Sequence, residues 1–303
     1  MVTLFLESIL KKLNTYRPYT DFMGRCAKDE FPVSLYGPKG SFLSLIIAAL
    51  QRQRKRTILV VLPSEKEVEA LVSDCSAFGI EAVGFPWWQA APYSEQPNHT
   101  NVSAKRMSVL AKLMNGEHLI VCASVRALMG VLPPRDLLEN NLIRLEVRGS
   151  FDPQSIEARL ESWGYLRVPR VSSPGEFALR GEVLDVGIPG ESEAVRVVFD
   201  FDEIEEIKGF DPVSQSSLDK RKTVTLFPAS EFIWTDTGIE RVVGFLDQQR
   251  YPGSGDGEVA ERLVETRTTR FEEIYYPLAF DTPSALVDYL DSTALTIFVS
   301  DKR

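Results

Sequence analysis

Apolar runs that alternate with helical segments dominate the first half of the chain and restrict the folds open to it. The run TILVVLP at 57–63 is almost entirely apolar, which is typical of a strand buried on both faces of a parallel sheet. A helix is predicted at 64–79, with Ser64 as N-cap, Glu67 completing a capping box and Gly79 as C-cap. Because such strand–helix units repeat, the sequence predicts an α/β fold, a doubly wound domain with a parallel sheet.

The other elements expected in this half continue the alternation. We expect an amphipathic helix at 1–16, a short strand at 32–37, a helix at 41–56, strands at 80–86 and 118–124, and a helix at 101–116.

The pattern changes near Gly149. A short helix is expected at 150–165, and period-two strands follow between 175 and 212. Alternation joined by tight turns predicts an antiparallel, β-rich domain, which is expected to end near 223–233. The final segment, 294–303, contains one more apolar strand. The α/β domain is therefore expected to be interrupted by a β-rich insert and then resumed.

The composition limits the kinds of site that the chain can carry. The net charge of −9 argues against a protein whose main task is to coat nucleic acid. The cysteines, Cys26, Cys75 and Cys122, are widely spaced without a C-x-x-C motif. We therefore expect no metal site and no disulfide framework, and we interpret the cysteines as reduced core residues of a cytoplasmic protein. No apolar stretch reaches the roughly 18 residues that span a bilayer.

The stretch SLYGPKGSFLSLIIAAL is similar to the start of a phosphate-binding P-loop but departs from its pattern. When the stretch is aligned on Gly37 and Gly40, the hydroxyl position is Ser44, but the lysine position holds Leu43. Without that lysine a polyphosphate loses its main fixed charge, and Phe42 stands where backbone must approach the phosphate. We therefore expect no nucleotide cofactor at this degenerate P-loop, whose glycines then serve only the geometry of the turn.

The acidic strand end that would complete an ATPase is also altered. The segment LTIFVSDKR offers Asp301, but Lys302 stands where a second acid is expected. No G-x-S-x-G motif occurs, and we interpret His118 as structural. The acidic run at 200–211 fits a hairpin turn and a solvent face better than a pair of catalytic carboxylates. No catalytic residue is therefore expected.

An aromatic loop allows two interpretations. Trp87, Trp88 and Tyr93 lie in a proline-punctuated segment that leads towards Lys105 and Arg106. Aromatic rings beside cations can stack nucleic-acid bases. A loop packed on its own domain explains the same residues, and we favour that interpretation.

Longer motifs in both halves resemble those of one protein family. The stretches PWWQAAPYSEQPNHTNVSAKRMSVLAKLM and LIVCASVRALMGVLPP resemble that family's LPY, isxRlxxLxxL and ivvxsvxaLmxxlxP patterns. GYLRVPRVSSPGEFALRGEVLDVGIPG is similar to its GYxRVxxVxxPGEFxxRGgilDiFPpG, VRVVFDFDEIEEIKGFDPVSQSSL to its vRieFFgDEIEsIRxFDpxtQrS, and LFPASEF to its llPAxEf. On these motifs the chain resembles the N-terminal, UvrB-homology region of the bacterial transcription-repair coupling factor (Mfd) family.

This resemblance implies a fold and a domain organisation. The family region is similar to UvrB, the repair helicase of the excinuclease system. The resemblance implies a degenerate helicase-like (RecA-like) parallel-sheet core without ATPase activity, interrupted by a smaller β-rich (α+β) domain known as domain 2. We therefore expect the core at 1–148 (domains 1A and 1B) and domain 2 at 149–232. The chain is then expected to return to the core at 233–303 and to end in a degenerate Walker B-like strand.

The resemblance also implies a partner, because domain 2 of both families carries the surface that binds the damage-recognition ATPase UvrA. Arg167 matches the arginine of GYxRV, Arg180 matches the arginine of RG, and Glu176 and Phe177 match EF. Arg170 is a nearby addition without a counterpart in the family pattern. Arginines make bidentate, charge-assisted contacts, and an exposed aromatic residue would serve as a hot-spot anchor. These five residues are the expected UvrA contacts.

The chain departs from the family pattern in two ways. Gly187 stands where the family usually has phenylalanine, so the UvrA contact is expected to be weaker or rearranged if that ring takes part. The modules with which the full-length family binds RNA polymerase and moves on double-stranded DNA lie beyond this region. The chain is therefore expected to be an N-terminal part of a longer protein, or a protein reduced to that part.

Three functions are then in competition. The leading hypothesis is a non-catalytic module of transcription-coupled nucleotide excision repair that recruits UvrA through domain 2. One alternative is a nucleotide-dependent DNA helicase of the UvrB kind. The other is a DNA-binding module that uses the basic run at 52–56 and the tryptophan loop.

Overall fold

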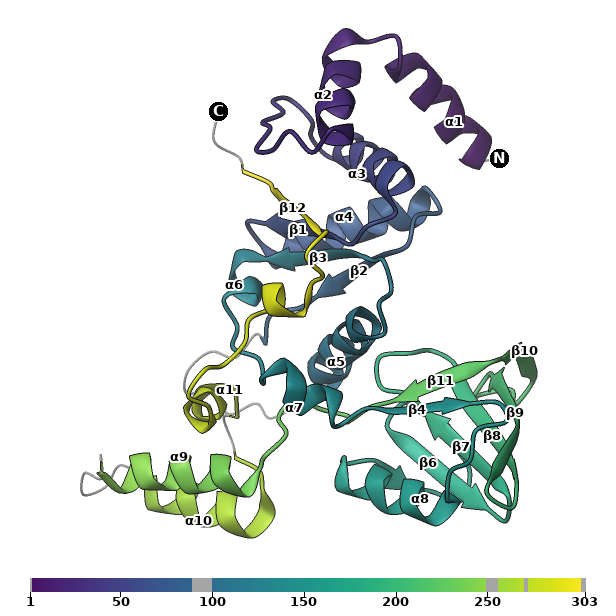
Figure 1. Ribbon diagram of the computed structural model, residues 1–303, viewed down its shortest axis with the longest axis vertical. Coiled ribbons are helices and arrows are strands. Elements are labelled where there is room, and N and C mark those ends of the chain that lie inside the picture. The colour runs from purple at the N-terminus through teal and green to yellow at the C-terminus, as the bar shows by residue number, and fades with distance from the viewer. Residues whose placement is uncertain (1, 89–99, 249–255, 270–271, 301–303) are drawn as a thin grey trace. The chain divides into compact units, whose positions relative to one another are not determined.

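The chain folds into two compact units, each built from separate stretches of sequence (Figure 1). The computed structural model describes residues 2–88, 100–248, 256–269 and 272–300. Unit 1 comprises Met1–Trp87, Asn115–Gly130 and Tyr289–Arg303, and unit 2 comprises Trp88–Met114 and Val131–Asp288. Across the described residues, no helix is long and apolar enough to cross a membrane.

Unit 1 contains a four-stranded parallel sheet in the order β12-β1-β3-β2 (Figure 1). Its strands are β1 (Ile58–Leu62), β2 (Ala82–Phe85), β3 (Ile120–Ser124) and β12 (Leu295–Phe298). Its helices are α1 (Val2–Leu13), α2 (Arg17–Ala27), α3 (Ser41–Arg54), α4 (Glu65–Ala77) and α6 (Val125–Leu128). The predicted parallel α/β sheet is confirmed. The last strand, β12, also joins this sheet, because Leu295 pairs in parallel with Ile58 on β1.

The core of unit 1 lies between this sheet and the helices beside it. Every residue of β1 and β3 is buried, as expected for central parallel strands covered on both faces. Ile47 of α3 and Leu71 of α4 belong to the same buried cluster as Val60 of β1. Helix α4 begins as predicted: the Ser64 hydroxyl accepts from the backbone N–H of Glu67 and donates to the Glu67 carboxylate.

The strand expected at 32–37 is not formed, and this prediction was wrong. The segment runs as extended and bent backbone into the turn before α3, and most of its residues are exposed. Pro32 and Pro38 both lack the backbone N–H that a sheet ladder needs. A short apolar run without those donors would form too few ladder hydrogen bonds to be held in the sheet.

Unit 2 is built around an antiparallel β-rich domain, as the period-two pattern predicted (Figure 1). A six-stranded sheet has the order β10-β9-β8-β7-β6-β5 and is antiparallel except where β5 runs parallel to β6. Its strands are β5 (Leu166–Arg167), β6 (Glu176–Arg180), β7 (Val183–Gly187), β8 (Ala194–Asp200), β9 (Glu203–Phe210) and β10 (Ser217–Arg221). A two-stranded sheet pairs β4 (Ile143–Glu146) with β11 (Thr223–Leu226).

Helices complete the unit. They are α5 (Thr100–Met114), α7 (Arg135–Glu139), α8 (Pro153–Ser162), α9 (Asp236–Gln248), α10 (Asp256–Thr266), α11 (Glu272–Tyr275) and the 3-10 helix η1 (Tyr276–Ala279). A second 3-10 helix, η2 (Leu286–Tyr289), leads back to unit 1 in the sequence. Ile156 and Leu160 of α8 are fully buried, and α8 contacts β6.

The two faces of the six-stranded sheet differ in chemistry. Alternate residues of a strand point to opposite faces. One face carries Phe177, Leu184, Val186, Val195 and Val197, none of which is measurably exposed. The opposite face carries charged side chains, among them Asp185, Arg196 and Lys208.

Candidate partner-binding surface

The P-loop-like turn has its two glycines in left-handed backbone conformations. Gly37 and Gly40 have φ angles of 105° and 52°, in the region that glycine adopts without steric cost. Ser44 is fully buried, and its hydroxyl lies beside the thiol of Cys75. Burial raises the pKa of that thiol, and the Ser44 hydroxyl partly offsets the rise. The hydroxyl that would bind magnesium in a working P-loop is therefore enclosed in the core.

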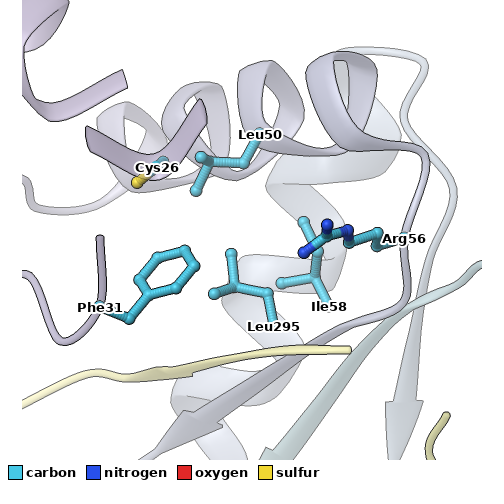
Figure 2. A pocket seen from close by; sticks show the side chains of 6 residues that line it. All are labelled: Cys26, Phe31, Leu50, Arg56, Ile58 and Leu295. Atoms are coloured by element: carbon cyan, nitrogen blue, oxygen red, sulfur yellow. The ribbon is translucent and has the colours of Figure 1, made fainter. Parts of the chain in front are cut away.

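A small apolar pocket in unit 1 has no room for a nucleotide (Figure 2). Its cavity volume of about 10 Å³ is close to the minimum for a single water molecule. It is lined by Cys26, Phe31, Leu50, Arg56, Ile58 and Leu295. The Arg56 guanidinium forms an ion pair with Asp29 at 3.0 Å. Asp301 and Lys302, the altered acidic strand end, lie outside the described residues.

The aromatic loop packs on its own domain at Trp88 and Arg106, whereas Trp87 is half-buried and Lys105 is exposed. Trp88 is 2% exposed and Arg106 is not exposed at all. The Arg106 guanidinium lies 4.7 Å from the centre of the Trp88 ring and bonds to both carboxylate oxygens of Glu231, at 2.9 and 3.0 Å. Base stacking by Trp88 and Arg106 is therefore ruled out, and the favoured packed-loop interpretation is confirmed for them. Tyr93 lies outside the described residues.

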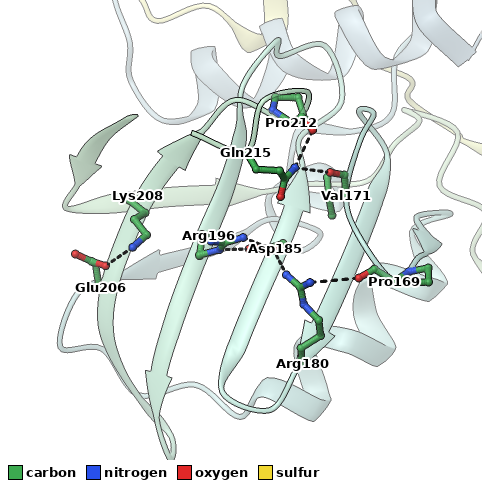
Figure 3. A network of polar contacts seen from close by, with 9 residues as sticks. All are labelled: Pro169, Val171, Arg180, Asp185, Arg196, Glu206, Lys208, Pro212 and Gln215. Carbon is green, nitrogen blue, oxygen red and sulfur yellow. Dashed lines mark hydrogen bonds and ion pairs between the residues drawn. The ribbon is translucent and has the colours of Figure 1, made fainter. Parts of the chain in front are cut away.

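The segment at 168–175 folds over part of the charged side of the six-stranded sheet. Val171 is buried there with Ala178, Ala194 and Phe210. The side-chain amide of Gln215 donates to the backbone oxygen of Val171 at 3.1 Å (Figure 3). These contacts fix the backbone from which the expected partner-binding side chains project.

Glu176 holds the same segment in place. Its carboxylate accepts from the backbone N–H groups of Ser172 and Ser173, at 2.8 and 3.0 Å, and from the Ser172 hydroxyl at 3.0 Å. Burial alone would raise the pKa of Glu176, but the N–H and hydroxyl donors outweigh it and lower the pKa. One carboxylate oxygen of Glu176 is thus occupied within the domain, where it fixes the loop.

Arg180 belongs to a compact ion cluster on the charged side (Figure 3). Its guanidinium lies 2.7 Å from the carboxylate of Asp185, which is 1% exposed, while Arg180 itself is half exposed. Arg196 binds the same carboxylate with two nitrogens, at 2.6 and 2.8 Å. The hydrogen bond to Asp185 raises the pKa of Arg196 despite its partial burial. One buried anion thus fixes two arginines, and one arginine remains open to a partner.

The structure brings together only part of the expected contact set. Arg170 donates to the backbone oxygen of Val213 at 3.3 Å, and Arg180 donates to the neighbouring backbone oxygen of Pro169 at 3.4 Å. Arg170 therefore belongs to the 168–175 segment, and Arg180 contacts that segment from β6. Arg167 instead forms an ion pair with Glu157 of α8.

Phe177 corrects one expectation. The sequence predicts an exposed aromatic anchor here, but none of the side chain is exposed. Phe177 precedes Ala178 on a strand whose residues alternate in direction, so it points into the core while Arg180 points outward. A residue without exposed surface cannot contact a partner directly, and Phe177 instead supports the strand.

Comparison with known proteins gives this domain a family. Residues 143–232 match the family model of the UvrB interaction domain. The transcription-repair-coupling factor of Borreliella burgdorferi is 24% identical over 279 residues, which cover 91% of this chain and 24% of that protein. The chain is homologous to the N-terminal, UvrB-homology region of the transcription-repair-coupling factors.

Further relatives include another coupling factor and a UvrABC system protein B. The transcription-repair-coupling factor of Myxococcus xanthus is 32% identical over 213 residues, 67% of this chain and 18% of that protein. The UvrABC system protein B of Kosmotoga olearia is 25% identical over 307 residues, 89% of this chain and 46% of that protein. The chain thus spans about a quarter or less of the coupling factors that it matches.

The sequence patterns missed several residues of the charged side. Asp185, Arg196, Lys208 and Lys220 were not among the expected contacts, although they lie side by side in the strand register. One signal was present: a lone aspartate in the middle of the apolar strand VLDVG needs a buried cation nearby. Which strand would supply that cation depends on register, which the local pattern does not reveal.

Proposed function

We propose that this chain is a non-catalytic module of transcription-coupled nucleotide excision repair that recruits UvrA through the domain at 149–232. The observation that carries the proposal is the Arg180–Asp185–Arg196 cluster within a domain that matches the UvrB interaction family. Arg180 offers half of its side chain to a partner, while the buried carboxylate fixes its geometry. An arginine held in this way loses little conformational freedom on binding, which favours affinity.

The expected contacts take different roles in this proposal. Arg170 and Arg180 contact UvrA directly, and Arg167 contacts it at the edge of the sheet, where it is more than half exposed. Glu176 positions the loop between them, and Phe177 supports β6 from the core. RNA polymerase and double-stranded DNA are proposed as partners of the full-length family, through parts that this sequence does not contain.

The rest of the chain fits a degenerate helicase-like core. We propose that residues 1–148 and 233–303 form this core, without ATPase activity, around the insert. The parallel strand pairing of β12 with β1 supports a core that resumes after the insert, and the enclosed hydroxyl of Ser44 supports the loss of nucleotide binding. Action in the cytoplasm is part of the proposal, since the repair partners work on chromosomal DNA.

A binding experiment with purified UvrA tests the proposal. The wild-type chain is expected to bind, and Arg180→Ala is expected to weaken binding by more than about 1 kcal/mol, or about fivefold in Kd. Isothermal titration calorimetry would measure both constants. Arg144→Ala is the matched control, because Arg144 is also exposed but lies on β4 in the other sheet.

Two results would contradict this function. The first is a wild-type chain without affinity for UvrA, and the second is equal affinity of the Arg180→Ala and Arg144→Ala variants. Circular dichroism of each variant shows whether a loss of binding reflects a loss of fold.

A further inference from the structure

A row of charged side chains crosses the six-stranded sheet beyond Arg180. The strand register places Asp185 beside Arg196, Arg196 beside Lys208, and Lys208 beside Lys220. Because paired residues point to the same face, these side chains form a line from β7 to the edge strand β10. Figure 3 shows the line as far as Lys208. We call the surface formed by Arg180, Asp185, Arg196, Glu206, Lys208 and Lys220 the charged face.

The far half of the charged face repeats the arrangement of the near half. Glu206 lies 2.9 Å from the ammonium of Lys208 and 2.7 Å from that of Lys220. A hydrogen bond from Lys220, which has the largest effect, and another from Lys208 lower the pKa of Glu206 to about 2. As with Asp185, one carboxylate holds two cations. Lys220 is the exposed member here, with 80% of its side chain accessible.

The charged face carries an excess of positive charge on an acidic chain. The four cations of the charged face share its two carboxylates, and Glu205 also acts on Lys220, so cations still outnumber the carboxylates around them. The chain as a whole carries a net charge of −9. A cationic surface set in an otherwise anionic protein steers association towards an acidic partner surface.

A pair of valines lies between the two halves. Val183 and Val198 are paired in the register of β7 and β8, next to the row of charges, and both are only partly buried. The Arg180 side chain borders them on β6, and Glu206 with its lysines borders them on β9. An apolar centre with a charged rim is the usual anatomy of a protein–protein contact.

We propose that the UvrA-binding surface extends across the whole charged face to Lys208 and Lys220, with Val183 and Val198 as its apolar centre. This inference rests on the proposed function and adds the chemistry of the partner surface. That surface carries acidic groups at two separated places and an apolar contact between them. Nucleic acid fits less well, because the face presents two carboxylates and apolar side chains rather than a continuous phosphate-binding groove.

The proposed extension is tested by measuring the UvrA affinity of variants that either lower or raise the net positive charge of the face. Lys220→Glu is expected to weaken binding about fivefold or more, because it replaces an attractive rim charge by a repulsive one. Glu206→Gln removes a negative charge from the same group and is expected to bind as tightly as wild type or tighter. Arg144→Glu is the charge-matched control on the other sheet and is expected to leave binding almost unchanged. A higher salt concentration should reduce the difference in UvrA affinity between Lys220→Glu and wild type.

The outcomes separate this inference from the function on which it rests. If the wild-type chain does not bind UvrA, the proposed function fails and the extension with it. If wild type binds and Arg180→Ala weakens binding but Lys220→Glu does not, only the extension fails. If Lys220→Glu and Glu206→Gln weaken binding alike, Glu206 and its two lysines have a structural role, and the extension is overturned. If Lys220→Glu reduces affinity for DNA but not for UvrA, the face serves nucleic acid, which also overturns it.

Discussion

Gly187 shows how a single residue lets a loop approach the six-stranded sheet closely. A Cβ atom at this position would lie 2.3 Å from the backbone oxygen of Ser173. The backbone N–H of Gly175 also donates to the Gly187 oxygen at 2.7 Å. The loop at 172–175 therefore occupies the space that a side chain would take. The rearranged contact that the sequence suggested stays a prediction, and the loop backbone at this position is compatible with it.

Substitution of Gly187 should therefore be costly. Gly187→Ala is expected to lower the free energy of unfolding by about 2 kcal/mol or more, because backbone must move to relieve the clash. Gly244→Ala is the matched control, since nothing lies within 4 Å of a Cβ there. Urea denaturation followed by circular dichroism measures both variants. Equal stability of Gly187→Ala and wild type would show that the loop at 172–175 does not close over this position.

At the scale of elements, helix α5 is joined to the β-rich domain by an unusually buried polar contact. The ion pair of Arg106 with Glu231 is completely enclosed, and the hydroxyl of Ser103 donates to that of Ser230 at 2.9 Å. Gly190 lets the chain pass close to the helix, since a Cβ there would lie 2.8 Å from the backbone oxygen of Ala104. The helix and the domain are thus fixed to each other by groups that tolerate little displacement.

The loss of either charge of this ion pair should strongly lower the free energy of unfolding. Arg106→Met is expected to lower the free energy of unfolding by about 3 kcal/mol or more, because Glu231 is left as a buried charge. Arg106→Met with Glu231→Leu should cost clearly less than the sum of the two single variants. Urea denaturation followed by tryptophan fluorescence measures the three proteins. Additive effects in this double-mutant cycle would contradict a direct interaction.

The same pair predicts a dependence on pH. Burial raises the pKa of Glu231, and Arg106 partly offsets the rise. In Arg106→Met that offset is lost, so the folded protein favours the protonated carboxyl more strongly than the unfolded chain does. A raised folded-state pKa stabilises at low pH, and the stability is lost as the pH rises. The destabilisation by Arg106→Met should therefore be larger at pH 8 than at pH 5, as urea denaturation at the two pH values would measure.

At the scale of the whole molecule, the order of the elements was more predictable than their contacts. Buried apolar runs predicted the parallel sheet, period-two alternation predicted the antiparallel β-rich region, and the last apolar strand was expected without its partner, which is β1. These signals are local and survive in any sequence that folds this way. The face to which Phe177 points and the cation that meets Asp185 depend on the register between neighbouring strands. A shift of one residue in that pairing reverses both, so local pattern cannot determine them.

The whole-molecule prediction is that this chain does not respond to nucleotide. A site with a Kd of about 10 µM would stabilise the native state by about 4 kcal/mol at roughly 5 mM Mg-ATP, and would raise the melting temperature by several degrees. We expect no such shift in differential scanning fluorimetry, and no phosphate release above background with double-stranded DNA present. Restoring the pattern with Phe42→Gly and Leu43→Lys should also fail. The added lysine supplies a charge, but the hydroxyl of Ser44 remains enclosed beside Cys75. A melting temperature that rises with Mg-ATP in the wild-type chain would contradict the degenerate core, whereas a rise only in the restored variant would show that the missing charge alone prevents binding.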